Sequence, residues 1–322
     1  HVIPCANGTD ALQIALMALS LKPGDEVICP SFTYVATAEV ISLLGLTPVM
    51  TDVDPDTFNI TADIIRPHIT SKTKAIVPVH LFGMCANMEA IMQISSEHDL
   101  FVIEDNAQAI GATDTYKNGT KVKAGVIGHA ASTSFFPSKN LGCYGDGGAV
   151  FTNNNEYAEK IKMIRVHGQN KRYHHKYIGM GGRLDTIQAA ILLAKLPHYK
   201  KELEARQKVA ENYTTILSDS LKTPVIKPKR LSVWAQYTVR VDNRDDVQSK
   251  LKDNGIPTAV YYPISLHLQE CFKNLNYKKG DFPISEKASN EAMSLPMNSF
   301  LTNKEIDYIC NYLKSDIIKK NG

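Results

Sequence analysis

The sequence lacks several features that would point to a membrane, a secretion route or a polyanionic partner. No apolar run approaches the ~20 residues that span a bilayer, and the first four residues, His-Val-Ile-Pro, do not form a signal peptide. Thirty-six basic residues face 33 acidic ones, a formal charge of +3. That excess is too small to predict nucleic-acid or membrane binding by bulk electrostatics. We therefore expect a cytoplasmic protein with neither partner.

Clustered metal ligands and paired cysteines are also missing. The six cysteines are scattered and form no C-x-x-C pair, and no H-E-x-x-H motif occurs. The one tight histidine pair, His174-His175, lies in a basic and aromatic stretch. We expect reduced thiols in the core and no metal site.

What the chain does have is length and apolar content, with 322 residues of which 43% are hydrophobic. Both suffice for a large domain and a smaller one. Up to about residue 190, short β-rich runs alternate with helical patterns, which predicts an α/β fold with a mostly parallel sheet. The expected strands are 26–29, 47–53, 75–82, 100–104, 130–136 and 149–152, and the expected helices are 10–19, 36–44 and 88–98.

The pattern changes in the second half. Residues 183–222 predict one or two long connecting helices, with a break or kink at Pro197. Beyond them we expect a strand at 234–241, a helix at 245–254 and a second strand at 258–262. We assign 1–194 to the large domain and 195–322 to a smaller α/β domain with its connecting helix. Because the chain opens directly on a strand and helix pattern, we also expect that a segment normally precedes it.

Lys139 stands in the most informative stretch, residues 132–148, where an apolar strand breaks at Pro137 and enters a glycine-rich loop. A lysine at a strand end is held rigidly, and partial burial lowers its pKa enough for it to act as an amine nucleophile. The alternative is a solvated loop lysine, and for an isolated lysine that is the commoner case.

Asp105 and Gln108 follow the apolar strand one βα unit earlier. An aspartate here can keep a pyridine nitrogen protonated, which makes pyridoxal phosphate (PLP) an electron sink, and Gln108 can reach the phenolic oxygen of that cofactor. The alternative role for Asp105 is an N-cap of the next helix.

Asn7-Gly8-Thr9-Asp10 joins a strand to a helix. Free N–H groups at such a helix start bind phosphate, although an ordinary capped helix has the same sequence. Ser134 offers a further hydroxyl from the lysine strand. Tyr34, after the strand that ends at Pro30, is our candidate to cover a flat cofactor, whereas Phe32 fits the core equally well.

Six ordered motifs resemble the DegT/DnrJ/EryC1/StrS family of sugar aminotransferases over essentially the whole chain. They are C-A-N-G-T-D-A-L (5–12), P-S-F-T-Y-V-A-T-A (30–38), V-I-E-D-N-A-Q (102–108), S-F-F-P-S-K-N-L-G (134–142), G-D-G-G-A (145–149) and R-L-D-T-I-Q-A-A-I-L (183–192). The resemblance implies the PLP-dependent transferase fold of the aspartate-aminotransferase type, a homodimer with shared active sites, and PLP bound through a Schiff base to Lys139.

The same resemblance implies roles for the other candidates. Asp105 would pair with the pyridine nitrogen and Gln108 with the phenolic oxygen, while Gly8, Thr9 and Ser134 would hold the phosphate. Lys139 would act as leaving group and as general base in a ping-pong exchange between glutamate and a nucleotide-linked keto sugar.

Stretches at 165–175, 235–240 and 260–264 are similar to the branch that aminates UDP-2-acetamido-2-deoxy-3-oxo-glucuronate for cell-surface polysaccharide (O-antigen) synthesis. Arg183 is our candidate for the sugar carboxylate or a nucleotide phosphate, since a guanidinium fits either. The basic run that contains His167 is either diphosphate-binding or ordinary solvated surface. The remaining candidate substrate contacts are Tyr261, Tyr262 and His267.

Two positions depart from the family pattern. Gly181 replaces an asparagine that usually reaches the PLP phosphate of the neighbouring subunit, and Tyr261 stands where a histidine is usual.

Three alternative functions stay open. The first is an aminotransferase of the same family that acts on a 4-keto or dTDP-keto sugar. The second is a dehydratase of the same fold, which Lys139 disfavours because such relatives carry histidine at that position. The third is a non-enzymatic PLP-binding regulator.

Overall fold

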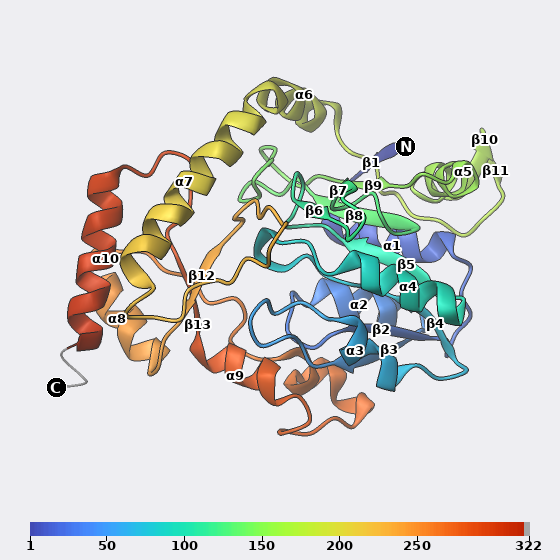
Figure 1. Cartoon of the computed structure of the whole chain (residues 1–322). Coiled ribbons are helices and arrows are strands. Elements are labelled where there is room, and N and C mark those ends of the chain that lie inside the picture. The colour runs from blue at the N-terminus through green and yellow to red at the C-terminus, as the bar shows by residue number, and fades with distance from the viewer. Residues whose placement is uncertain (319–322) are drawn as a thin grey trace.

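The computed structural model describes residues 1–318, and its centre is a seven-stranded sheet (Figure 1). Every strand runs in the same direction except β9, which is antiparallel to both of its neighbours. This confirms the mostly parallel α/β sheet. In spatial order the strands are β1 (Val2–Cys5), β9 (Gly148–Phe151), β8 (Ala130–Ser134), β5 (Phe101–Asp105), β4 (Thr73–Ile76), β2 (Glu26–Pro30) and β3 (Thr47–Thr51).

Helices cover both faces of this sheet. Side chains alternate along each strand, so Val27 and Cys29 join the core under one layer of helices and Ile28 joins the core under the other. The first layer holds α1 (Gly8–Ala18), α2 (Ala36–Leu43) and α5 (Asn155–Ile164), and the second holds α3 (Ala62–Ile65) and α4 (Met88–His98). Two hairpins lie outside the sheet, β6 (Thr113–Thr115) with β7 (Lys121–Lys123) and β10 (Gln169–Lys171) with β11 (His174–His175).

A long helical connector leads to the second domain (Figure 1). It consists of α6 (Thr186–Lys195) and α7 (Tyr199–Leu217), and Pro197 lies in the 3-10 turn between them, as the sequence predicts. A third core is built from α7, the antiparallel pair β12 (Tyr237–Arg240) and β13 (Ala292–Leu295), α8 (Arg244–Asp253) and α10 (Asn303–Ile318).

Among the expected strands, those at 258–262 and 75–82 differ most from the structure, while those at 47–53, 130–136 and 234–241 are shorter than expected. At 258–262 only Ala259 pairs, through one bridge to Ser294, after which the chain turns along a cavity and reaches Pro263, which has no N–H to donate. At 75–82 regular pairing ends with Ile76, since Pro78 interrupts it and a 3-10 turn follows at Leu81–Gly83.

The second domain is not one continuous stretch from residue 195. Leu266, Phe272 and Phe282 pack into the core of the large domain. Helix α9 (Pro283–Glu291) is capped from that domain, because Asp52 at the end of β3 accepts from the backbone N–H of Ser285 at 2.7 Å. The segment between Thr258 and α9 therefore ties the two domains together.

All six cysteines are free thiols, five of them buried and Cys271 exposed. Among residues 1–318, none of the helices is both long and apolar enough to cross a membrane. Over the same range, no three His, Cys, Asp or Glu side chains form a group that could hold a metal ion.

Candidate active site

A cavity of about 400 Å³ opens where β2, β5 and β8 end, with the second domain forming its opposite wall. The carboxyl ends of parallel strands are the usual place for a ligand in such sheets. Nine of the residues singled out from the sequence line this one cavity: Gly8, Thr9, Tyr34, Asp105, Gln108, Ser134, Lys139, Tyr261 and Tyr262.

The start of α1 forms one end of the cavity. Asn7 caps the helix by accepting from the N–H of Asp10 at 2.8 Å, and Gly8 and Thr9 lie in its first turn. A Cβ at Gly8 would lie 2.7 Å from Ser134 Cβ, so only glycine lets the helix and β8 come this close. The helix dipole, the first-turn N–H groups and the two hydroxyls together suit a phosphate.

Lys139 is half-buried beside the cavity. Burial lowers the pKa of its amine below the ordinary 10.5, and the nearby Asp105 carboxylate partly opposes that shift. In the part of the chain that the structure describes, its Nζ has no hydrogen bond or ion pair. The next residue fixes the loop, because the buried Asn140 donates through Nδ2 to the carbonyl of Val233 at 2.7 Å.

Asp105 is held at the end of β5 with its carboxylate at the cavity. Thr37 donates its hydroxyl to Oδ2 at 2.8 Å, and the N–H of Ala107 donates to Oδ1 at 3.2 Å. No helix starts after Asp105, so the alternative N-cap role does not apply. Thr37 is a residue that the sequence reasoning missed, although it lies one helical turn beyond Tyr34.

Gln108 has a fixed carboxamide. Its Oε1 accepts from the N–H of Phe82 at 2.7 Å, which orients Nε2 as a donor. Nε2 reaches the hydroxyl of Tyr262 at 3.2 Å and has a second hydrogen for a ligand oxygen.

Two tyrosines form the aromatic wall. The rings of Tyr34 and Tyr262 lie 6.1 Å apart at 41°, and the Tyr34 side chain, 57% exposed, lies at the mouth of the cavity. Burial raises the pKa of the Tyr262 hydroxyl well above its usual range, and Asp105 adds to that effect. Phe32 is in the core instead.

Glu104, the acid that directly precedes Asp105, does not line this cavity. Its buried carboxylate accepts from His80 Nε2 at 2.8 Å and from three backbone N–H groups, those of Gly125, Ile127 and Gly128, at 2.7 to 2.8 Å. Glu104 thus holds together the loops behind the site, and Asp105 is the carboxylate that lines the cavity.

Three candidates lie outside this cavity. Arg183 is exposed. His167 is also exposed, and a Cβ at Gly181 would lie 3.2 Å from its ring, so His167 occupies the space beside that glycine. His267 is buried and bonded to Ser31 Oγ at 2.7 Å and Glu286 Oε1 at 3.1 Å, and it does not line the cavity.

Gln236 and Asp146 also line the cavity and were not singled out. Nothing in the local sequence at 235–240 or 145–149 distinguishes a wall residue from its neighbours.

The assembled donors fit a flat cofactor that carries both a phosphate and a pyridine nitrogen. The cradle at Gly8 suits the phosphate, the Asp105 carboxylate suits the nitrogen, and the unpaired Lys139 amine suits an aldehyde. This is the combination that PLP requires.

Comparisons with known proteins agree with this reading. The model of the DegT/DnrJ/EryC1/StrS aminotransferase family matches residues 1–314. A UDP-2-acetamido-2-deoxy-3-oxo-D-glucuronate aminotransferase of Pseudomonas aeruginosa is 51% identical over 311 residues, 96% of this chain and 84% of the relative. A pleiotropic regulatory protein of Geobacillus stearothermophilus is 50% identical over 313 residues, covering 96% and 83%.

A crystal structure shows the same fold. The DegT/DnrJ/EryC1/StrS aminotransferase from Brucella abortus superimposes with a TM-score of 0.93 at 42% identity, covering 98% of this chain and 86% of that one. The chain therefore belongs to the DegT/DnrJ/EryC1/StrS aminotransferase family.

Proposed function

We propose that this protein uses PLP to transfer the amino group of glutamate to C3 of UDP-2-acetamido-2-deoxy-3-oxo-glucuronate. Family membership gives the enzyme class and the cofactor. The substrate is supported by the relative that is 51% identical and is named for it. The observation that carries the proposal is the unpaired amine of Lys139 in one cavity with Asp105 and the start of α1.

The residues that line the cavity then divide the work. Gly8, Thr9 and Ser134 bind the phosphate, Asp105 keeps the pyridine nitrogen protonated, and Gln108 donates to the phenolic oxygen. Bound PLP supplies an electron sink for the carbon that loses or gains a proton. The amine of Lys139 would hold the cofactor and, when free, would carry that proton, a task that its lowered pKa suits.

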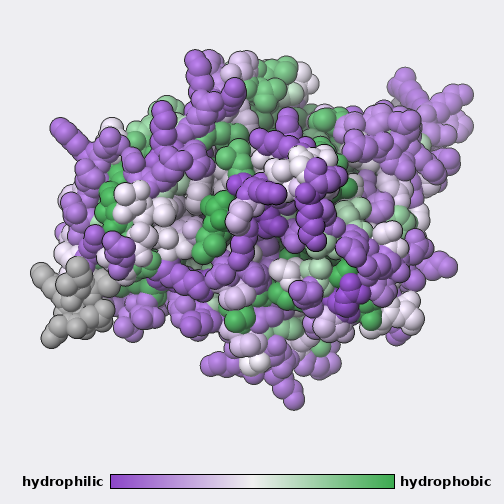
Figure 2. Space-filling model, in the orientation of Figure 1, coloured by the Kyte–Doolittle hydropathy of each residue, from purple (hydrophilic) through white to green (hydrophobic). Residues whose placement is uncertain are grey.

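The working form that we propose is a homodimer with shared sites. Helix α6 supports it, because none of its side chains is buried although its sequence, TIQAAILLAK, is largely apolar. Ile187 and Leu193 are 70% and 71% exposed, and Figure 2 shows an apolar patch at the top of the molecule, where α6 lies. An unpartnered apolar face of this kind indicates a protein interface, and a second copy is its simplest occupant.

The dimer also gives Arg183 and His167 a role. Arg183 is exposed and, over residues 1–318, has no ion pair. We propose that it enters the partner's cavity and binds the sugar carboxylate or a phosphate. His167, beside Gly181, would come with it. Tyr261 and Tyr262, already at the cavity wall, would contact the sugar from within the same chain.

We further propose a cytoplasmic enzyme whose product enters cell-surface polysaccharide synthesis. The six free thiols fit a reducing compartment.

The test is to offer amino sugars to the PLP-loaded protein and follow the loss of the cofactor's long-wavelength absorption, which is the sugar half-reaction in reverse. We expect the UDP-linked 3-amino uronic acid and glutamate each to bleach the band. Bleaching only by a 4-amino or dTDP-linked sugar would replace the substrate and keep the chemistry. If no amine bleaches it, the proposal is wrong.

A regulator without enzymatic activity is the second candidate, favoured by the name of the Geobacillus relative. Tight, sequence-dependent binding of duplex DNA at moderate salt, together with no bleaching, would support it.

A further inference from the structure

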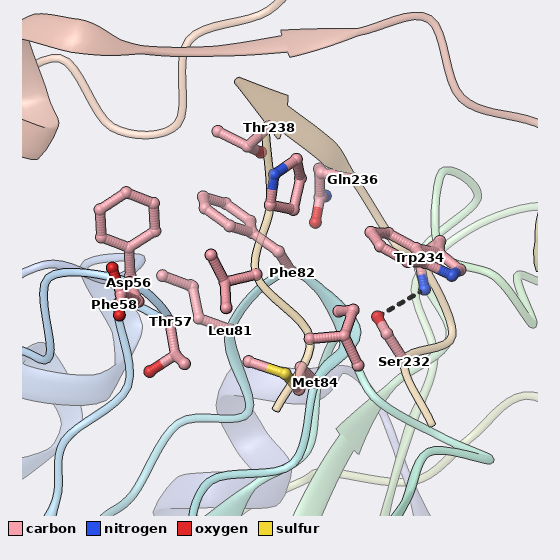
Figure 3. A pocket seen from close by; sticks show the side chains of 13 residues that line it. Asp56, Thr57, Phe58, Leu81, Phe82, Met84, Ser232, Trp234, Gln236 and Thr238 are labelled. Atoms are coloured by element: carbon pink, nitrogen blue, oxygen red, sulfur yellow. Dashed lines mark hydrogen bonds between the residues drawn. The ribbon is translucent and has the colours of Figure 1, made fainter. Parts of the chain in front are cut away.

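Gln236 separates two cavities. It lines the catalytic cavity and also a smaller one of about 30 Å³, whose other walls include Phe82 and Trp234 (Figure 3). The smaller cavity lies between the two domains, since Phe82 follows β4 and Trp234 precedes β12. The side chain of Gln236 is thus part of the wall that the second domain contributes to the active site.

The carboxamide of Gln236 has no partner within residues 1–318. Its Oε1 is buried without a hydrogen bond, and its Nε2 has none either. A buried polar atom without a partner destabilises the folded protein, and such atoms are rare. Packing alone therefore does not account for a glutamine here, because an apolar side chain of the same length would avoid that cost.

The backbone around Gln236 is fixed to the rest of the site. The N–H of Ala235 donates to the carbonyl of Phe82 at 3.1 Å, and the N–H of Phe82 donates to Gln108 Oε1 at 2.7 Å. Two residues before Ala235, the carbonyl of Val233 accepts from Asn140, the neighbour of Lys139. These bonds hold the backbone at Gln236 in place before a ligand arrives, which is part of what recognition requires.

We propose that Gln236 determines specificity for the keto sugar by bonding a neutral group that both donates and accepts, an acetamido or a hydroxyl group. This inference rests on the proposed function. A carboxamide has a donor and an acceptor side by side and no charge, which suits these groups. The two carboxylates of glutamate are better matched by cations, so Gln236 should matter little for the amino donor.

The test compares Gln236→Met, which keeps the length and removes both polar ends, with Gln236→Glu, which removes the donor. The control is Gln93→Met on α4, an exposed glutamine whose amide bonds Glu97 at 3.0 Å. Binding of the UDP-linked 3-amino uronic acid is measured by calorimetry on the protein loaded with pyridoxamine phosphate, on which that sugar cannot react. Bleaching of the PLP form by glutamate is measured in parallel.

We expect both Gln236 variants to bind the sugar about tenfold more weakly, the effect of losing a hydrogen bond or two. Their rates with glutamate should stay within about threefold of the wild type, and Gln236→Met should melt no lower because it removes an unpartnered amide. If Gln236→Met does not fold, Gln236→Glu carries the test. Unchanged sugar binding, or equal losses for both substrates, would overturn the inference while leaving the proposed function intact.

A sugar with a hydroxyl in place of the 2-acetamido group identifies the partner. If the variants and the wild type bind this analogue with equal affinity, the acetamido group is the partner of Gln236. If the variants still bind it about tenfold more weakly, the partner is a hydroxyl group. Wild-type protein that binds none of these sugars would overturn both the inference and the proposed function.

Discussion

Thr37 donates its hydroxyl hydrogen to Oδ2 of Asp105 at 2.8 Å, across the gap between α2 and the end of β5. Together with the N–H of Ala107, which donates to Oδ1 at 3.2 Å, this bond fixes the orientation of the carboxylate at the cavity. We expect Thr37→Val to weaken PLP binding by about 10-fold or more, the loss of one hydrogen bond to a charged group, whereas Thr37→Ser retains that bond. Absorbance titration of the PLP-free protein measures this, and equal affinities for Val and wild type would contradict it.

Lys139→Ala should lower the rate of amino transfer by about 100-fold or more, since it removes the proton carrier. Reduction with borohydride followed by peptide mass mapping should find PLP attached at residue 139 of the wild type and nowhere in the variant. Because burial lowers the pKa of Lys139, the PLP-free protein should capture the cofactor with a pH midpoint below 10.5. The control is Lys200→Ala, an exposed lysine on α7.

The lowered pKa of Glu104 predicts how the free energy of unfolding depends on pH in the acid range. Burial is the largest single effect on its pKa and would raise it, but the bonds from His80, Gly125 and Gly128 together hold that pKa below the ordinary 4.5. A carboxyl whose pKa is lowered by folding stabilises the folded protein at pH values above its ordinary pKa. This stabilisation is lost as the pH falls through the lowered pKa. The free energy of unfolding should therefore decline below about pH 4.5.

Glu104→Gln should remove that decline. It should also lower the free energy of unfolding at pH 7 by about 3 kcal/mol, as breaking a buried pair does. Urea unfolding of the PLP-free protein at pH 7 and pH 4 measures both effects. Glu97 forms an exposed pair with Arg66, so Glu97→Gln should leave the urea unfolding curves at both pH values unchanged. A Glu104 variant as stable as the wild type at pH 7 would contradict the argument.

Gly8→Ala places a Cβ 2.7 Å from Ser134 Cβ, so α1 must shift away from β8. We expect a loss of about 1–3 kcal/mol in stability and weaker binding of PLP. The double variant Gly8→Ala with Ser134→Gly removes the opposing atom. It should regain stability but not PLP affinity, because the Ser134 hydroxyl is gone. Recovery of both would mean that Ser134 does not bind the phosphate.

Leu193→Glu should convert the proposed dimer to monomers, since it places a charge in the exposed apolar face of α6. Sedimentation velocity measures the change, and loss of activity should accompany it if the sites are shared. Phe300→Glu is the matched control, because Phe300 is 83% exposed but lies just before α10, far along the chain from α6. An unchanged sedimentation coefficient for Leu193→Glu would place the interface elsewhere.

Local patterns were enough for most of the fold. The alternation of apolar runs predicted the parallel sheet, and helix α4 was predicted to the residue, because strand and helix periods are written into neighbouring side chains. The strand expected at 258–262 failed, because whether a short apolar run pairs depends on a partner more than thirty residues away. The return of Leu266 and Phe282 to the large domain has no local signature for the same reason.

For the site, the sequence by itself determined the chemistry of its parts. It determined the lysine after a strand, the two acids at the end of the neighbouring strand, and the glycine that opens a helix. Only the tertiary structure decided that Thr37 orients Asp105, that His267 is bonded to Ser31 and Glu286 and does not line the cavity, and that Gln236 reaches the cavity without a partner. The physical reason is that a side chain's chemical type is set by its own atoms, whereas its orientation and partners are set by distant segments that the fold brings together.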